Sequence, residues 1–215
     1  KGDTTNSEDQ LWVVVERNGK NEVERMALQF TDNLSDNYKS EGAYLDSHVR
    51  NPVNGLLTDP TTQITVPARI IQNNFVRVVV DGVDLGDIYV SEGVNTLPDG
   101  ITASQYTLVG LPYKGKLELN PQAFDNGSGK NSYGQINRTV SFHPYVYKSM
   151  GYKIGFSEDE LETIPPKGGA SLYTGFTDEH NIIASQFDVD KTPIIVQDKP
   201  YPLTLVSAVL KTEML

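Results

Sequence analysis

Three aspartates at intervals of three residues are the clearest candidate for cation binding in the sequence. Asp81, Asp84 and Asp87 alternate with Gly82 and Gly86, and carboxylate oxygens are ligands that Ca²⁺ prefers. A calcium loop of the EF-hand type needs oxygens at alternate positions and a closing glutamate, and that spacing is absent. Aspartate and glycine are also the residues that a tight turn between two strands requires. We therefore interpret this segment as a turn and predict no metal ligands in it.

A second group of carboxylates consists of Glu158, Asp159, Glu160 and Glu162. Glycoside hydrolysis needs two carboxylates that face each other across a cleft, with pKa values set apart by their surroundings. A run of neighbouring acidic residues forms a solvated charged surface instead. The run could begin a helical turn, which the prolines at 165 and 166 would end.

Gly127–Lys130 matches a phosphate-binding P-loop only in part. The motif needs Ser or Thr after the lysine and a glycine five residues before the Gly-Lys pair, but Asn131 and Phe124 occupy those places. We interpret residues 125–134 as a flexible loop.

The histidines and cysteines give no catalytic pattern. His48, His143 and His180 are far apart in the sequence, so they form no local metal motif. No G-x-S-x-G elbow is present for a serine nucleophile. The chain has no cysteine, which excludes disulfides, thiolate zinc sites and cysteine nucleophiles. The sequence therefore predicts a protein that is not an enzyme, without catalytic, cofactor-binding or metal-binding residues.

Aromatic residues offer one further binding chemistry. Trp12, Tyr145, Tyr147 and Tyr152 could line a sugar-binding face. Aromatic residues in strands more often fill a core or an assembly interface, and the sequence leaves these uses open.

Composition limits the elements that must carry these residues. With 215 residues, 38% of them hydrophobic, the chain can form one large or two small domains. Eleven Tyr and seven Phe favour strands, and 18 Gly and 12 Pro favour frequent turns. The net charge of -10 opposes broad binding to nucleic-acid phosphates. No apolar run approaches the roughly 20 residues of a membrane-spanning helix.

Alternating polar and apolar residues predict antiparallel strands joined by turns. Residues 11–30 read as a hairpin around Asn18–Gly19, and Asp81–Gly82 reads as a second hairpin turn. Pro144 is expected at an edge or a bulge. The further strands are expected at Ala43–Ser47, Phe75–Val80, Asp87–Val90 and Gln105–Val109, within 136–156, and at Ile194–Val196 and Leu203–Leu210.

These elements predict a mainly β fold, with antiparallel sheets that form one or two small sandwich-like or barrel-like domains with long loops. Residues 1–50 are expected to form a hairpin and a strand of a larger sheet. Residues 51–125 are expected to form a small sandwich or barrel, because prolines and turn residues in 51–63 indicate a boundary. Residues 126–215 would return as strands that pack on the first sheet.

An ordered series of short segments runs through almost the whole chain. Its members are Gln10–Arg17, Val23–Met26, Ala43–Ser47, Val80–Gly82, Val109–Tyr113, Gln135–Val140, Ser149–Gly155, Tyr173–Gly175 and Pro202–Leu205. The series resembles one that recurs in the tail nozzle proteins of short-tailed bacteriophages, also called tail tubular protein B or packaged-DNA stabilisation proteins. Between Ser47 and Phe75 the sequence departs from that series.

The resemblance implies a structural virion protein, a β-rich subunit of a homohexameric tail tube. Such a tube would sit below the portal and adaptor, contact tail fibres or spikes, and retain and then conduct genomic DNA without sequence-specific binding. It would be assembled in the host cytoplasm and located in the virion tail. Nozzle proteins are longer, so the chain would be a C-terminal portion, and the family brings no catalytic residues or cofactors.

Two other functions stay open on the residues alone. One is a carbohydrate-binding β-sandwich of a phage receptor-binding or bacterial surface protein, which exposed aromatics near Trp12 or Tyr145 would favour. The other is a hydrolase of the cell envelope, which would need converging carboxylates or a histidine dyad.

Overall fold

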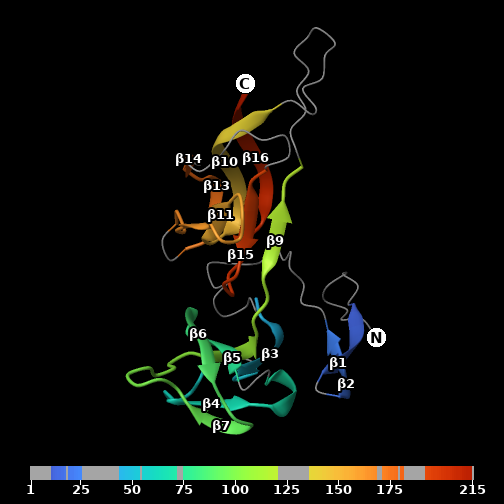
Figure 1. Ribbon diagram of the computed structural model, residues 1–215. Coiled ribbons are helices and arrows are strands. Elements are labelled where there is room, and N and C mark those ends of the chain that lie inside the picture. Colours follow the sequence, from blue (N-terminus) through green and yellow to red (C-terminus); the bar gives the residue numbers. More distant parts are fainter. Residues whose placement is uncertain are drawn as a thin grey trace. The chain divides into compact units, whose positions relative to one another are not determined.

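The computed structural model divides into two compact units, residues 1–113 and 114–215 (Figure 1). It describes residues 11–17, 19–25, 44–53, 55–71, 75–120, 136–168, 171–178, 180–181 and 192–214. In these residues the only helix is a short 3₁₀ turn, η1 (Ala68–Ile70), and all sheets are small and antiparallel, with none closed into a barrel. The mainly β fold predicted from the sequence is confirmed.

The first unit contains three sheets. One is the hairpin β1-β2, the second has the order β3-β8-β5-β6, and the third pairs β4 with β7. The strands are β1 (Trp12–Arg17), β2 (Lys20–Arg25), β3 (Asp46–Asn51), β4 (Gln63–Val66), β5 (Phe75–Val80), β6 (Val83–Tyr89), β7 (Gly93–Thr96) and β8 (Thr107–Leu111).

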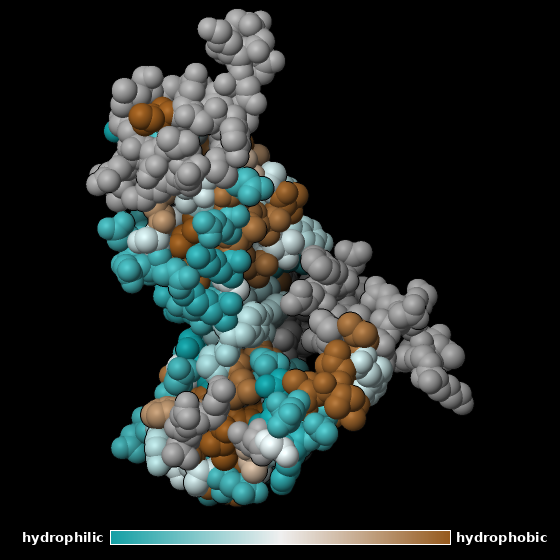
Figure 2. Space-filling model, turned by 45° about the vertical axis from the view of Figure 1, so that its right-hand side comes forward, coloured by the Kyte–Doolittle hydropathy of each residue, from teal (hydrophilic) through white to brown (hydrophobic). Residues whose placement is uncertain are grey.

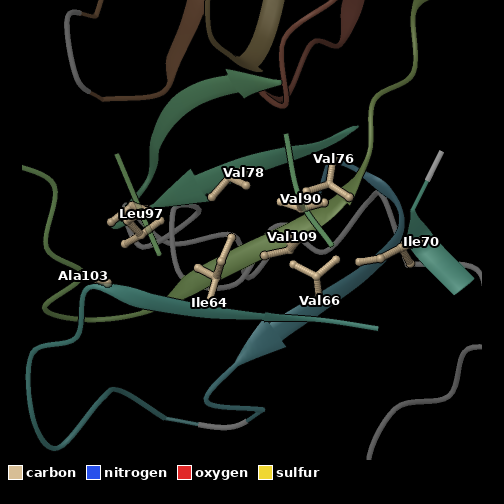
Figure 3. Close-up of a cluster of buried hydrophobic side chains, with 10 residues drawn as sticks. Ile64, Val66, Ile70, Val76, Val78, Val90, Leu97, Ala103 and Val109 are labelled. Atoms are coloured by element: carbon tan, nitrogen blue, oxygen red, sulfur yellow. The ribbon is translucent and has the colours of Figure 1, made fainter. Parts of the chain in front are cut away.

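An aliphatic core lies between the four-stranded sheet and the β4-β7 pair (Figure 3). Because side chains alternate along a strand, Val76, Val78 and Val80 of β5 all point into this core, where they meet Ile64 and Val66 of β4. Aliphatic β-branched side chains suit such a pleated, buried surface. The predicted strand Phe75–Val80 is confirmed at both ends.

Both predicted hairpins are confirmed, and each has a two-residue turn. Arg17 pairs with Lys20 across the first turn, in which Gly19 has φ 74°. Val80 pairs with Val83 across the second, in which Asp81 and Gly82 have φ 50° and 80°. Positive φ at both central residues is the geometry of a type I′ turn, whose twist matches that of the flanking strands. Residues 26–30 of the first predicted hairpin lie outside the described residues.

The second unit has two four-stranded sheets. β10 pairs with β13 and β14 on one side and with β16 on the other, and the second sheet has the order β12-β11-β15-β9. The strands are β9 (Gly115–Glu118), β10 (Asn137–Ser149), β11 (Tyr152–Gly155), β12 (Glu162–Ile164), β13 (Tyr173–Phe176), β14 (His180–Asn181), β15 (Ile194–Gln197) and β16 (Leu205–Met214).

The core of the second unit draws on both of its sheets. Phe142 and Val146 of β10 pack with Ile154 of β11 and Ile195 of β15. Side chains of β16, among them Leu205, lie against the same cluster. Each unit is thus a small sandwich held by its own core.

Pro144 lies in an interior strand and not at an edge, whereas the predicted alternative, a bulge, agrees with the shift in register against β16 next to it. On one side of β10 the partner changes around this residue, from β14 at Phe142 to β13 at Tyr145. Proline has no N–H to donate, and its carbonyl accepts a hydrogen bond from the Thr177 backbone on this side. The change of partner therefore removes the need for the missing donor, and the register against β16 also shifts at Tyr145/Val146.

Several predicted strand ends move. β3 begins at Asp46 and ends at Asn51, and β8 begins at Thr107 and continues through Gly110 to Leu111. The expected helical turn at 158–161 is a tight turn in which the Glu160 N–H donates to the Ser157 carbonyl over 3.3 Å. The boundary expected at residue 125 lies outside the described residues. The finer division into three segments stays a prediction.

Candidate functional site

Asp84 and Asp87, two of the three candidate cation ligands, are bound to an arginine. Arg77 on β5 donates from Nε and Nη2 to the two oxygens of Asp84, at 2.7 and 2.5 Å, and from Nη1 to Asp87 at 3.3 Å. Asp84 also accepts the Gly86 N–H at 3.1 Å. The neighbouring carboxylates raise the pKa of Arg77, chiefly through the Asp84 hydrogen bonds. A guanidinium therefore occupies the position that a cation would need.

Asp81, the third aspartate, ties the β5–β6 turn to the segment before β8. Its two carboxylate oxygens accept the backbone N–H groups of Ser104, Gln105 and Tyr106 at 2.8 to 2.9 Å. The Asp81 N–H returns a hydrogen bond to the Tyr106 carbonyl at 3.1 Å. Asp81 thus occupies the predicted turn and also acts as a clamp between two segments, which the sequence analysis did not predict.

The acidic run at 158–162 is a solvated surface. Glu158, Asp159, Glu160 and Glu162 are all exposed. Glu158 pairs with Lys114 and, at 3.4 Å, with Lys116. These lysines lower its pKa, whereas the acid of a glycosidase pair needs a raised pKa.

The histidines have separate environments. His48 lies on β3, and its burial lowers its pKa, which favours the neutral ring. His143 contacts Phe176 with its ring tilted by 49° and the ring centroids 4.8 Å apart. His180 belongs to β14, opposite Phe142 of β10. Across the described parts of the chain, no group of three or more His, Asp or Glu could hold a metal ion.

The aromatic candidates divide into buried and exposed residues. Tyr152 is buried, its hydroxyl lies 3.2 Å from Thr177 Oγ1, and burial raises its pKa to about 12. Tyr145 is half-buried and meets Phe176 edge-on at 5.0 Å. Tyr147 is also half-buried, whereas Trp12 is 58% exposed. Among the described contacts, none joins two of these four aromatic side chains.

An ion-pair network that the sequence analysis missed attaches the β1–β2 hairpin to β3. Arg17 donates to both oxygens of Glu24, at 2.9 and 3.0 Å, and to both oxygens of Asp46 at 3.0 Å. The Ser47 hydroxyl donates to Glu24 at 2.6 Å. Arg17 and Ser47 lower the pKa of Glu24. The spacing of seven residues across a hairpin turn, shared by Arg17–Glu24 and Arg77–Asp84, is a signal that could have indicated both pairs.

The opposite side of this hairpin carries exposed apolar residues. Trp12, Val14 and Val23 are 58%, 71% and 67% exposed. With Glu16, Asn21 and Arg25, which are exposed and alternate with them on the same side, they form a surface that we name the outer hairpin face. Figure 2 shows that hydrophobic residues reach the surface in both units, bordered by hydrophilic ones. Exposed apolar patches on folded proteins commonly mark interaction sites.

Comparison with models of known protein families and with curated proteins finds no match in either. In the described residues, no helix has the length and apolar character needed to cross a membrane. The described surface carries exposed apolar strand residues and ion pairs. The candidate acids are bound to cations, clamp backbone N–H groups or lie in solvent.

Proposed function

We propose that the chain is a structural module of the tail nozzle of a short-tailed bacteriophage, which assembles with further copies and helps to form a conduit for DNA. The observation that carries the proposal is the ordered resemblance of its short segments to nozzle proteins. These segments include Trp12–Arg17 in β1, the Val80–Gly82 turn and the Tyr173–Gly175 part of β13. They fall in both units, so the resemblance is not confined to one hairpin.

Exposed apolar strand residues support assembly as the mode of action. Besides the outer hairpin face, β16 exposes Val206 and Val209 at 60% and 56%. Folded subunits bury such residues when they associate, because removal of apolar surface from water is favourable. Structural subunits act through contacts of this kind and need no reactive constellation.

The acidic balance suits a conduit. A net charge of -10 gives a surface that repels phosphates over a Debye length of roughly 10 Å in salt. DNA would then slide past such a subunit without being held. Tight binding of this chain to duplex DNA, weakening steeply with added salt, would contradict this part of the proposal.

The test is the mass distribution of the intact parent protein, alone and with its neighbouring tail proteins, by light scattering and negative-stain imaging. Rings or tubes that stack on an adaptor are the expected result. A stable monomer that does not associate with other tail proteins would overturn the proposal.

A carbohydrate-binding module is the second candidate, favoured by the exposure of Trp12. A ring exposed on a strand can stack on the apolar face of a sugar. Trp12 is the only tryptophan, so titration of its fluorescence with neutral oligosaccharides tests the carbohydrate-binding function. A saturable change that Trp12→Ala abolishes would support it, whereas a flat response alongside assembled tubes would remove it.

A further inference from the structure

We propose that the outer hairpin face is a pairing surface for a second copy of this chain, with the two hairpins packed face to face about a two-fold axis parallel to their strands. This contact goes beyond the proposed nozzle function, because a two-fold contact closes on two copies and does not generate a ring. The two can therefore fail separately.

The outer hairpin face contributes little to the stability of the hairpin. β1 and β2 pair only with each other among the described strands, and none of their apolar side chains belongs to the core clusters of the described residues. The hairpin is attached to β3 by the polar contacts of Arg17 and Glu24. A two-stranded hairpin alone is marginally stable in water, so burial of its apolar outer face would be favourable.

The register of the hairpin makes this face complementary to itself. Trp12 lies opposite Arg25, Val14 opposite Val23 and Glu16 opposite Asn21. A two-fold axis along the strands keeps each row level and exchanges the strands, so that each β1 residue covers the β2 residue of the same row in the other copy.

Each row then forms a favourable pair. Arg25 of one copy covers the Trp12 ring of the other in a cation–π contact, and Val14 covers Val23. Glu16 meets the Asn21 amide, which can donate to a carboxylate. No like charges meet. A two-fold axis perpendicular to the strands would instead place the Glu16 carboxylate of one copy on the negative face of the Trp12 ring of the other. That contact is unfavourable.

The contact is small. Six residues a side are far fewer than the roughly 20–30 of a stable interface, so we expect a weak pair. Thiol cross-linking detects weak pairs, and the chain has no cysteine of its own. Facing sheets lie about 10 Å apart, too far for a direct disulfide, so a short bifunctional maleimide is the reagent to use.

The experiment mixes two single variants of the full chain, Val14→Cys and Val23→Cys. The cross-linked dimer should form several-fold faster in the mixture and in each variant alone than in a control at an unrelated surface site, because the axis brings positions 14 and 23 of both copies into one row of the contact. Val94→Cys, on β7 and 63% exposed, is the matched control and should cross-link only at the rate of random collision. Sedimentation equilibrium of the unmodified chain should show dimer at high concentration, and Val23→Glu should remove it, whereas Val94→Glu should not.

Two results would overturn the proposal. One is a cross-linking rate in the mixture equal to that of the Val94→Cys control. The other is a monomer at every concentration, with no difference between Val23→Glu and the unmodified chain. Ring assembly by the parent protein with either result would retain the nozzle function and remove only the pairing surface.

Discussion

The β1–β2 and β5–β6 hairpins are built alike but placed differently. Both have a short turn that contains a glycine with positive φ, Gly19 in one and Gly82 in the other. Both carry an arginine that binds a carboxylate seven residues later and a second carboxylate beside it. In β5–β6 the central valines lie in the core of a sandwich, whereas in β1–β2 Val14 and Val23 face solvent.

The difference shows that local pattern and tertiary burial are separate properties. A turn signal with alternating residues specifies a hairpin, because the turn fixes the register. The stability of the hairpin comes from what covers its faces. Equivalent substitutions in the two hairpins should therefore have unequal effects.

The largest difference is expected for the central valines. Val78→Ala should lower the free energy of unfolding by about 2–3 kcal/mol, because it leaves a cavity in a fully buried site. Val14→Ala, at an exposed site, should change it by less than about 0.5 kcal/mol. Urea unfolding of both variants measures the contrast. Equal losses would mean that the β1–β2 hairpin is covered in solution.

The second-largest difference in stability is expected between substitutions of the two arginines. Arg77→Met should cost about 2 kcal/mol, because the Asp84 side chain, only 7% exposed, keeps its charge without the cation that balances it. Arg17→Met should cost less than about 1 kcal/mol, because solvent can replace the guanidinium at the half-exposed Asp46 and Glu24 keeps the Ser47 hydroxyl as a donor. Urea midpoints of the two variants give the comparison. A larger loss for Arg17→Met would contradict the view that the first hairpin is loosely attached.

The Asp81 clamp gives a third contrast, because it connects β5–β6 to a neighbouring segment. Asp81→Ala removes the acceptor for three backbone N–H groups and places alanine at φ 50°. We expect a loss of about 1.5 kcal/mol. Asp81→Asn, which tolerates this φ and retains one acceptor oxygen, should lose less. If both variants lost the same amount, the carboxylate charge and not the turn geometry would be the main contribution.

These residues also show which features of the fold could be predicted from the sequence. The hairpin turns and strand β5 were predictable, because Asn-Gly and Asp-Gly pairs and alternating valines act locally. The second role of Asp81 was not, because the N–H groups that donate to it lie more than 20 residues away, at Ser104–Tyr106. Pro144 was expected at an edge or a bulge because a proline lacks a donor, but the gap beside it comes from a change between two partner strands. Such compensation depends on long-range pairing, which no local pattern records.

One acidic segment of the candidate site was predictable from the sequence. Composition and spacing indicated correctly that the 158–162 carboxylates lie on a solvated surface. The burial of Tyr152 and the exposure of Trp12 could not be separated, since both residues occur in similar strand contexts. Burial depends on which faces the sheets bring together.

The smallest predicted effect concerns pH and the attachment of the first hairpin. Arg17 and Ser47 hold the pKa of Glu24 below its usual value, so the folded state binds this proton less readily than the unfolded chain. The Glu24 contribution is therefore complete above about pH 5 and is lost as the pH falls through the folded pKa. Because the network is partly exposed, its size should be below about 1 kcal/mol. Amide hydrogen exchange in β1 and β2 should accelerate between pH 5 and 3 beyond the intrinsic pH dependence of exchange, relative to amides of β5. In Glu24→Gln this extra acceleration should disappear, because the titrating group is gone. Its persistence in that variant would assign the pH effect to a group other than Glu24.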